Sequence, residues 1–328
     1  MTPCNSRRAL IVGINDYNPR CFRPLKGCVP DAQEMAKVLS RNSDQSLNFD
    51  CKLLTSADGP PITRGFLRRQ WRDLFHNFKE DILFYFSGHG VLTEVGGYLV
   101  TQDGEPDDPG LPMEQVVTMA NSCAARTVLL ILDCCFSGSA GNPASLQPGS
   151  IGNWTVLREG VTILAASGST ELSLETGGHG VFTRLVLNAL GGGAADVRGY
   201  VSAASIYAYV DAALGAWNQH PLYKSHAAFL NPIRLCEPKV PDSLLRELPE
   251  YFSRPDRQYQ LDKTYERTSG VAIEAHVEIF RKFKKLQVGG LLKPTTGDDL
   301  YWTADSSGYV ILTDLGRFYL QLVNDRRI

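Results

Sequence analysis

Residues 81–90 read DILFYFSGHG, and residues 127–138 read TVLLILDCCFSG. Each stretch begins with an almost uninterrupted apolar run and ends in polar residues and glycine. Such runs are typical of central strands in a parallel sheet that helices cover on both faces. Parallel strands end at a common carboxyl edge, where α/β proteins place their active sites. The two stretches therefore predict that His89 and Cys135 lie side by side at that edge.

The sequence around these two stretches has the pattern of an α/β domain up to residue 236. Short β-rich runs alternate with amphipathic segments, which predicts a mostly parallel central sheet flanked by helices. We expect strands at residues 9–14, 51–54, 81–86, 98–101, 127–132, 161–166 and 229–234. We expect helices at residues 32–39, 62–75, 182–190 and 202–217.

The composition changes after Cys236. Residues 237–268 are rich in proline, arginine and acidic side chains, which indicates a partly ordered connector. Residues 269–328 predict a helix, a hairpin of residues 301–304 and 309–312, and a last helix capped by Thr313. This order resembles the winged-helix family, a small α+β domain. Its near-balanced charge argues against DNA reading and favours a regulatory or protein-interaction role.

Composition and charge narrow the class of protein. The 328 residues are 43% hydrophobic, which allows a sizeable core, and 33 Lys+Arg against 35 Asp+Glu give a net charge of −2. This balance argues against a nucleic-acid partner or a basic membrane patch. We find no apolar run near the ~18 residues of a membrane span. Eight cysteines without a recognisable secretion signal predict reduced thiols and a cytoplasmic location.

His89 and Cys135 suit nucleophilic catalysis. Beside an imidazole, a thiol is deprotonated more easily, and the thiolate can attack a carbonyl while the imidazolium protonates the leaving amine. Taken singly, His89 would be read as a loop histidine and Cys135 as a small buried apolar residue. Their matching positions at two strand ends favour the catalytic pair.

These stretches resemble those of caspases, metacaspases and their bacterial relatives, the orthocaspases. The resemblance covers residues 7–236 and also rests on RRALIVGINDY, LKGCVPDAQEMAKVL, VTILAAS and HGVFTRLVLNALGG. It implies the caspase–hemoglobinase fold and peptide-bond hydrolysis by a dyad of His89 and Cys135. Metacaspases usually have histidine where Phe136 stands, so the bacterial branch is favoured. By analogy, such proteases serve regulated cell death or defence.

The resemblance also implies roles for further residues. The oxyanion hole would be formed by the backbone N–H groups of Gly90 and Cys135. A pocket for arginine or lysine at P1, the substrate residue before the cut bond, would consist of four side chains: Cys28, Asp31, Ser87 and Asp133. Two carboxylates suit a guanidinium group. Asp31 could instead cap the helix at 32–39, and Asp133 could accept hydrogen bonds from loop amides.

We expect no metal or cofactor. Asp103, Asp107 and Asp108 could bind Ca²⁺ by residue type, but a solvated acidic loop is the preferred interpretation. The expected partners are a protein or peptide substrate with a basic P1 residue and a protein partner at the C-terminal domain, with a monomer favoured. The alternative is a catalytically silent scaffold that acts through that domain.

Basic specificity also limits where the protein could cut itself. Residues 138–157 contain no lysine or arginine, so we expect no activating cut there. The remaining candidates are Arg158 and basic residues of the connector, namely Lys239, Arg246, Arg254, Arg257, Lys263 and Arg267.

Overall fold

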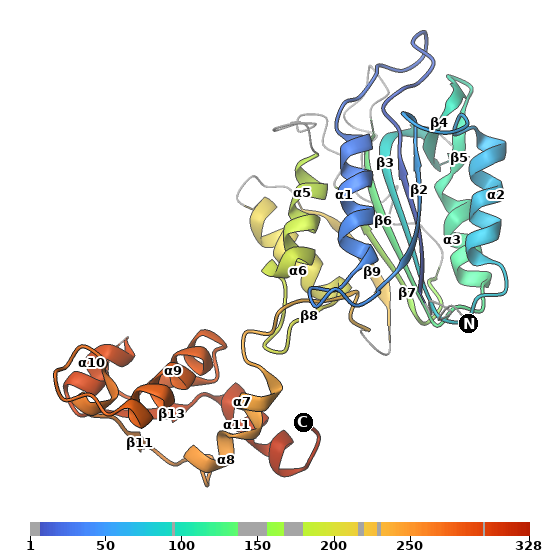
Figure 1. Ribbon diagram of the computed structural model, residues 1–328. Coiled ribbons are helices and arrows are strands. Elements are labelled where there is room, and N and C mark those ends of the chain that lie inside the picture. Colours follow the sequence, from blue (N-terminus) through green and yellow to red (C-terminus); the bar gives the residue numbers. More distant parts are fainter. Residues whose placement is uncertain are drawn as a thin grey trace. The chain divides into compact units, whose positions relative to one another are not determined.

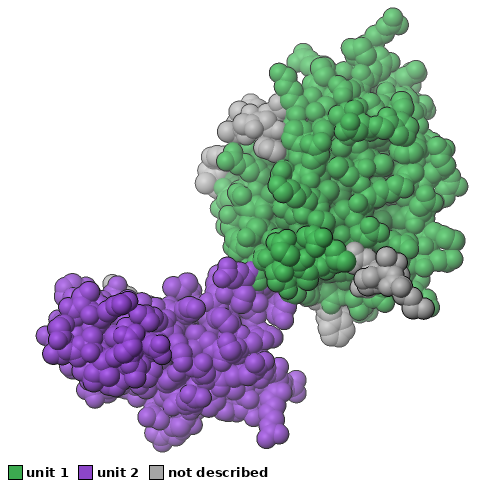
Figure 2. All heavy atoms as spheres, viewed as in Figure 1, with its two compact units in different colours: residues 1–195, 201–236 green, residues 196–200, 237–328 purple. Residues whose placement is uncertain are grey.

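The computed structural model describes residues 7–93, 96–136, 156–166, 180–215, 220–227, 231–297 and 299–328, with Cys135 and Phe136 described by their backbone alone. The chain forms two compact units. The first comprises residues 1–195 and 201–236, and the second comprises residues 196–200 and 237–328 (Figure 2).

The first unit is built on a mostly parallel sheet. Its strand order is β2-β1-β3-β6-β7-β9, with β4 pairing to β3 and β5 to β4. The pairs β1/β2, β1/β3, β3/β6 and β6/β7 are parallel, whereas β7/β9, β3/β4 and β4/β5 are antiparallel. The strands are β1 (Arg7–Gly13), β2 (Asp50–Thr55), β3 (Asp81–Thr93), β4 (Gly96–Glu105), β5 (Asp108–Pro112), β6 (Thr127–Phe136), β7 (Val161–Ala165) and β9 (Leu222–His226).

Helices cover both faces of this sheet. Figure 1 shows α1 (Cys28–Ser40), α5 (Val181–Asn188) and α6 (Ala203–Leu214) on one face, and α2 (Arg64–Phe75) and α3 (Met113–Ser122) on the other. A π-helical turn, η2 (Ala189–Gly193), continues α5, and the short strands β8 (Tyr200–Val201) and β10 (Arg234–Leu235) pair outside the main sheet. The predicted α/β fold class is therefore confirmed.

The two layers of helices explain why β3 has an apolar run without alternation. Phe84 and Phe86 belong to the hydrophobic cluster under α2 and α3, together with Trp71. Leu83 and Tyr85 belong to the cluster on the α1 side of the sheet. Because successive side chains of a strand point to opposite faces, a strand covered on both faces needs apolar residues at every position.

The structure differs from the sequence prediction at several elements of the first unit. The strand next to β7 is β9 at residues 222–226, whereas the predicted strand at 229–234 appears only as β10, with residues 228–230 outside the described part. Strand β9 is partly exposed and carries polar residues, which hid it from a search for apolar runs. Strand β5 and helix α3 were not predicted.

The second unit contains short helices around a three-stranded sheet. Its helices are α7 (Asp242–Arg246), α8 (Leu248–Tyr251), the 3₁₀ turn η4 (Lys263–Tyr265), α9 (Glu274–Val288), α10 (Leu300–Asp305) and α11 (Asp314–Asn324). Its strands β11 (Tyr259–Gln260), β13 (Tyr309–Leu312) and β12 (Leu292–Pro294) pair antiparallel in that order.

The predicted hairpin of this unit is wrong. Residues 301–304 lie in α10, because the Asp299 side chain accepts the Tyr301 N–H at 2.6 Å and starts a helix there. Strand β13 pairs with β11 and β12 instead. The winged-helix expectation rested on that hairpin and is not confirmed. The predicted cap of the last helix is present, since the Gly316 N–H donates to Thr313 Oγ1 at 3.1 Å.

Residues 237–268, expected as a partly ordered connector, are folded in the structure. Val240, Leu248, Phe252 and Leu261 are completely buried and pack in one cluster with residues of α9 such as Phe283. Prolines and charged residues separate these apolar positions, so no regular period marks them in the sequence.

In the described residues, no helix is long and apolar enough to cross a membrane.

Candidate active site

Strand register brings the two candidate catalytic residues together. In the parallel pair of β3 and β6, His89 lies opposite Cys135 and Ser87 lies opposite Asp133. Gly90 follows on β3, opposite Phe136. Both strands run past the predicted ends at residues 86 and 132, so these residues lie within the extended ends of the strands. The expected juxtaposition at the carboxyl edge is thus present in the backbone.

The His89 ring is held from the loop that follows β1. Its Nε2 lies 2.8 Å from the backbone oxygen of Arg23, and its backbone N–H donates to the Tyr17 hydroxyl at 2.8 Å. A carbonyl oxygen only accepts, so Nε2 carries the proton and Nδ1 is the basic nitrogen of the neutral ring. Burial lowers the pKa of His89, and the hydrogen bond to Arg23 only partly opposes this shift. The ring is therefore neutral near pH 7.

Tyr17 is a site residue that the sequence analysis missed. Its ring packs on His89 with 4.8 Å between the ring centroids, and burial raises the pKa of its hydroxyl. A Cβ atom at Gly88 would lie 2.5 Å from the Tyr17 hydroxyl oxygen, so the glycine before His89 makes room for Tyr17. A polar aromatic residue just beyond the end of β1 was the available signal, because β1 ends at the same carboxyl edge.

Asp31 and Asp133 form an acidic pair at the start of α5. The Gly180 N–H donates to Asp31 Oδ2 at 3.0 Å, and the Thr183 hydroxyl donates to Asp133 Oδ2 at 2.5 Å. A Cβ atom at Gly180 would lie 2.9 Å from Asp133 Oδ2 and 3.3 Å from Asp31 Oδ2, so both carboxylates approach one point. Burial raises the pKa of Asp133 to about 6; the Thr183 hydrogen bond opposes the shift, and the charge of Asp31 adds to it.

The alternative role of Asp31 as a helix cap is wrong. Helix α1 begins at Cys28, three residues before Asp31, and Asn15 accepts the N–H groups of Cys28 and Val29 at 3.0 and 3.2 Å. Asn15 thus takes the role of the cap from outside the helix. The side chain of Asp31 instead accepts the Gly180 N–H.

The other two pocket candidates lie close to the acidic pair in the fold. Cys28 is buried in the first turn of α1, and Ser87 is buried on β3. A Cβ atom at Gly13 would lie 2.3 Å from the Cys28 backbone oxygen, so α1 starts directly against β1. Gly13 is also the register partner of Ser87. The structure therefore gathers Cys28, Asp31, Ser87 and Asp133 at the carboxyl edge.

The acidic loop considered for Ca²⁺ binding is engaged by arginine. Asp103 accepts from the Arg64 backbone N–H at 2.9 Å and from its Nε at 3.3 Å, and Asp108 also forms an ion pair with Arg64. Within the described ranges, no group of three or more histidine, cysteine or acidic residues is arranged for a metal ion.

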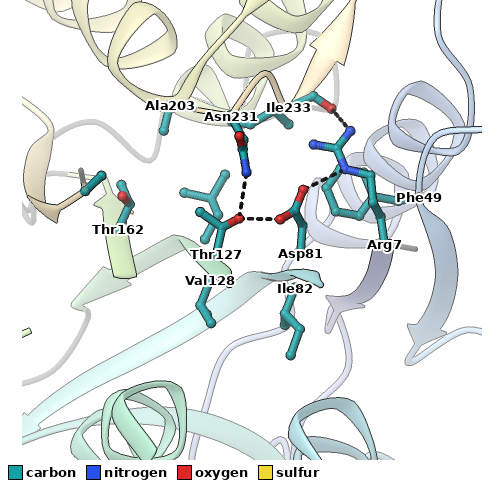
Figure 3. A pocket seen from close by; sticks show the side chains of 12 residues that line it. Arg7, Phe49, Asp81, Ile82, Thr127, Val128, Thr162, Ala203, Asn231 and Ile233 are labelled. Atoms are coloured by element: carbon teal, nitrogen blue, oxygen red, sulfur yellow. Dashed lines mark hydrogen bonds and ion pairs between the residues drawn. The ribbon is translucent and has the colours of Figure 1, made fainter. Parts of the chain in front are cut away.

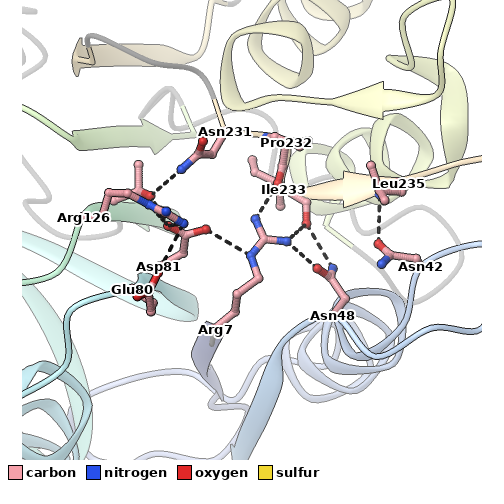
Figure 4. Close-up of polar contacts among 11 residues, drawn as sticks. Arg7, Asn42, Asn48, Glu80, Asp81, Arg126, Asn231, Pro232, Ile233 and Leu235 are labelled. Atoms are coloured by element: carbon pink, nitrogen blue, oxygen red, sulfur yellow. Dashed lines mark hydrogen bonds and ion pairs between the residues drawn. The ribbon is translucent and has the colours of Figure 1, made fainter. Parts of the chain in front are cut away.

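A small cavity of about 40 Å³ lies at the opposite edge of the sheet (Figure 3). Its polar lining includes the first residues of three parallel strands: Arg7, Asp81 and Thr127. Figure 4 shows Asp81 between Arg7 and Arg126 in a network of hydrogen bonds. This network ties the amino ends of the strands together and is remote from His89.

The comparisons with known proteins agree with this architecture. The sequence matches the family described as Caspase domain over residues 6–230. This chain belongs to the caspase-like peptidase family. The chain is also similar in fold to the crystal structure of protein GSU0716 from Geobacter sulfurreducens, with 18% identity, a TM-score of 0.53, and coverage of 70% of this chain and 99% of that one. Among curated proteins, none matches significantly.

Family membership supports a cysteine peptidase, and the match does not extend into residues 237–328, the main part of the second unit. The match stops at residue 230, and apart from the short segment 196–200 the second unit consists of residues 237–328. Likeness to the Geobacter protein concerns the fold alone. The roles of individual residues must therefore be argued from the site itself.

Proposed function

We propose that this protein is a cysteine endopeptidase that hydrolyses peptide bonds after arginine or lysine. The observation that carries the proposal is the acidic pair beside a register-matched histidine and cysteine. Asp31 and Asp133 approach one point at the same edge of the sheet where His89 is the register partner of Cys135. A caspase domain with this edge is suited to a substrate that has a cationic side chain next to the cut bond.

In the proposed reaction, Nδ1 of the neutral His89 removes the proton from the Cys135 thiol. The thiolate attacks the substrate carbonyl, and the backbone N–H groups of Gly90 and Cys135 stabilise the resulting oxyanion. The imidazolium returns its proton to the leaving amine as the C–N bond breaks. Water, deprotonated by His89, then hydrolyses the thioester and regenerates the thiol.

P1 selection would come from charge. A guanidinium or ammonium group between Asp31 and Asp133 relieves the repulsion between the two carboxylates and makes charge-assisted hydrogen bonds. Cys28 and Ser87 would form small walls of the same pocket. An acidic P1 side chain would instead add a third negative charge in a poorly solvated place. Cleavage after aspartate is therefore disfavoured by the same two residues.

The test uses paired fluorogenic peptides that end in arginine, lysine or aspartate, with and without Ca²⁺. Wild type should cleave the basic peptides, and Cys135→Ala should abolish this cleavage. Asp133→Asn should lower kcat/KM for the arginine peptide by about 10- to 100-fold, the size expected for a hydrogen-bonded charge contact. Cleavage after aspartate would refute the pocket, and cleavage that persists in Cys135→Ala would refute the nucleophile. No cleavage under any condition would favour the silent scaffold.

A further inference from the structure

Thr183 connects the acidic pair to the core of the caspase domain. It lies in the first turn of α5 and is fully buried. Its hydroxyl donates to Asp133 Oδ2 at 2.5 Å and also lies 2.7 Å from the hydroxyl of Tyr85. Tyr85 is itself fully buried on β3.

The direction of these hydrogen bonds follows from the charge of Asp133. An ionised carboxylate only accepts, so the single hydroxyl proton of Thr183 is given to Asp133. Thr183 must then accept a hydrogen bond from the Tyr85 hydroxyl. The result is a directed chain of hydrogen bonds from Tyr85 through Thr183 to Asp133. It ties one of the four proposed P1 residues to the buried part of β3.

The same turn of α5 contacts the other carboxylate. The Gly180 N–H donates to Asp31, so one helix start holds both members of the acidic pair. Holding them is costly, because burial and mutual repulsion both favour a protonated carboxyl group. A protonated Asp133 would be a poor partner for a cationic side chain. Hydrogen bonds to the ionised form counteract this cost.

We propose that Thr183, oriented by Tyr85, is a positioning residue for recognition of a basic P1 side chain. It acts by keeping the Asp133 carboxylate ionised and aimed at the point shared with Asp31. This inference rests on the proposed function and adds the residues that make the acidic pair work. Thr183 and Tyr85 themselves need not touch the substrate.

Packing alone is the rival explanation, and Thr183→Val distinguishes the two, because valine has the shape of threonine without the hydroxyl. For an arginine peptide at pH 7, we expect Thr183→Val to raise KM by about 10- to 100-fold, with a much smaller change in kcat. Thr183→Ser keeps the hydroxyl and should restore KM to within about threefold of wild type. Tyr85→Phe should raise KM in the same direction, but less.

The pH dependence gives a second readout. Among the described residues, the titratable groups that act on Asp133 are Asp31 of α1 and, through Thr183, Tyr85 of β3. Wild-type KM should rise as the pH falls through about 6, where Asp133 becomes protonated. In Thr183→Val and Tyr85→Phe this rise should begin at a higher pH, because a hydrogen bond to the ionised form is lost or weakened.

Two controls separate this effect from damage to the dyad or the fold. Alkylation of Cys135 by iodoacetamide, followed by peptide mass spectrometry, reports the dyad without any P1 contact and should be unchanged in Thr183→Val. The pH dependence of the alkylation rate also shows the titration of His89 separately from that of Asp133. Thr162→Val is the matched core control, since Thr162 is buried and bonded to Ser225 at 2.7 Å on β7 and β9. It should leave KM unchanged.

The outcomes are distinguishable. If wild type does not cleave after arginine or lysine, the proposed function fails. If wild type does so, but Thr183→Val keeps the wild-type KM and pH midpoint, the inference is overturned. It is also overturned if Thr183→Val slows alkylation of Cys135 as much as it raises KM. Should Thr183→Val not fold, an unchanged pH midpoint in Tyr85→Phe overturns it equally.

Discussion

The buried charge of Asp133 at the carboxyl edge lowers the free energy of unfolding of the caspase domain. The pKa of Asp133 rises from the ordinary value of 3.8 to about 6, mainly through burial. The folded chain therefore binds this proton more tightly than the unfolded chain does. The resulting cost is absent below pH 4, grows between pH 4 and 6, and is complete above pH 6.

We therefore predict that Asp133→Asn is more stable than wild type at pH 8. About 2 pKa units correspond to an upper limit of about 3 kcal/mol, and partial exposure of the side chain reduces the expected gain to about 2 kcal/mol. The gain should vanish at pH 4. Urea titrations of both proteins at pH 4, 6 and 8 measure it.

The control for this prediction is Asp73→Asn, which removes an exposed carboxylate on α2 of the same unit. It should change the free energy of unfolding by less than about 0.5 kcal/mol at every pH. If wild type instead becomes more stable relative to Asp133→Asn as the pH rises, the assigned direction of the Asp133 pKa shift is contradicted.

Among the helices and strands, the sequence predicted most reliably the central strands that have helices packed on both faces. The uninterrupted apolar runs of β3 and β6 predicted these two strands and, from their shared carboxyl edge, the juxtaposition of His89 and Cys135. Tyr17 and Thr183 were missed because they reach their partners across 72 and 50 residues of sequence. The one local signal, the place of Tyr17 just beyond β1, does not identify His89 as its partner. Residues 237–268 were misread because charged residues and prolines separate their buried positions.

Phe252 tests whether this last segment belongs to the core of the second unit. It is fully buried and lies 6.0 Å from Phe283 between ring centroids. Phe252→Ala should destabilise the second unit by about 3–5 kcal/mol, the cost of emptying an aromatic site. Its exposed neighbour provides the matched variant, Ser253→Ala, with an expected change below about 0.5 kcal/mol. Thermal unfolding followed by calorimetry compares them, and equal midpoints would restore the connector interpretation.

At the scale of the whole chain, the candidate sites of self-cleavage differ in how firmly the structure holds the arginine side chain. The guanidinium of Arg158 donates to the backbone oxygens of Ala120 and Ala125 at 3.1 and 2.7 Å. A P1 arginine must give up such contacts to enter a pocket, which costs several hydrogen bonds at once. Arg254 and Arg257 instead lie in the exposed stretch 253–258, between α8 and β11.

We predict that an active preparation cuts itself after Arg254 or Arg257 and leaves Arg158 intact. Intact-mass measurement and N-terminal sequencing locate the cut, and the double variant Arg254→Gln, Arg257→Gln should abolish it. Cys135→Ala should stay whole alone, but it should be cut at the same sites when wild type is added. A new terminus after Arg158, or anywhere within residues 138–157, would contradict the prediction.

Such a cut would not by itself separate the pieces. Phe252 before the exposed stretch and Leu261 after it are both fully buried in the cluster that includes Phe283 of α9. Burial of this kind contributes roughly 1.5–3 kcal/mol for each large apolar side chain, so the cluster should outlast one broken peptide bond. The nicked protein should therefore run as two bands on a denaturing gel but elute at the position of the intact chain in size-exclusion chromatography. Spontaneous dissociation on the column would instead mean that the second unit depends on chain continuity through residues 253–258.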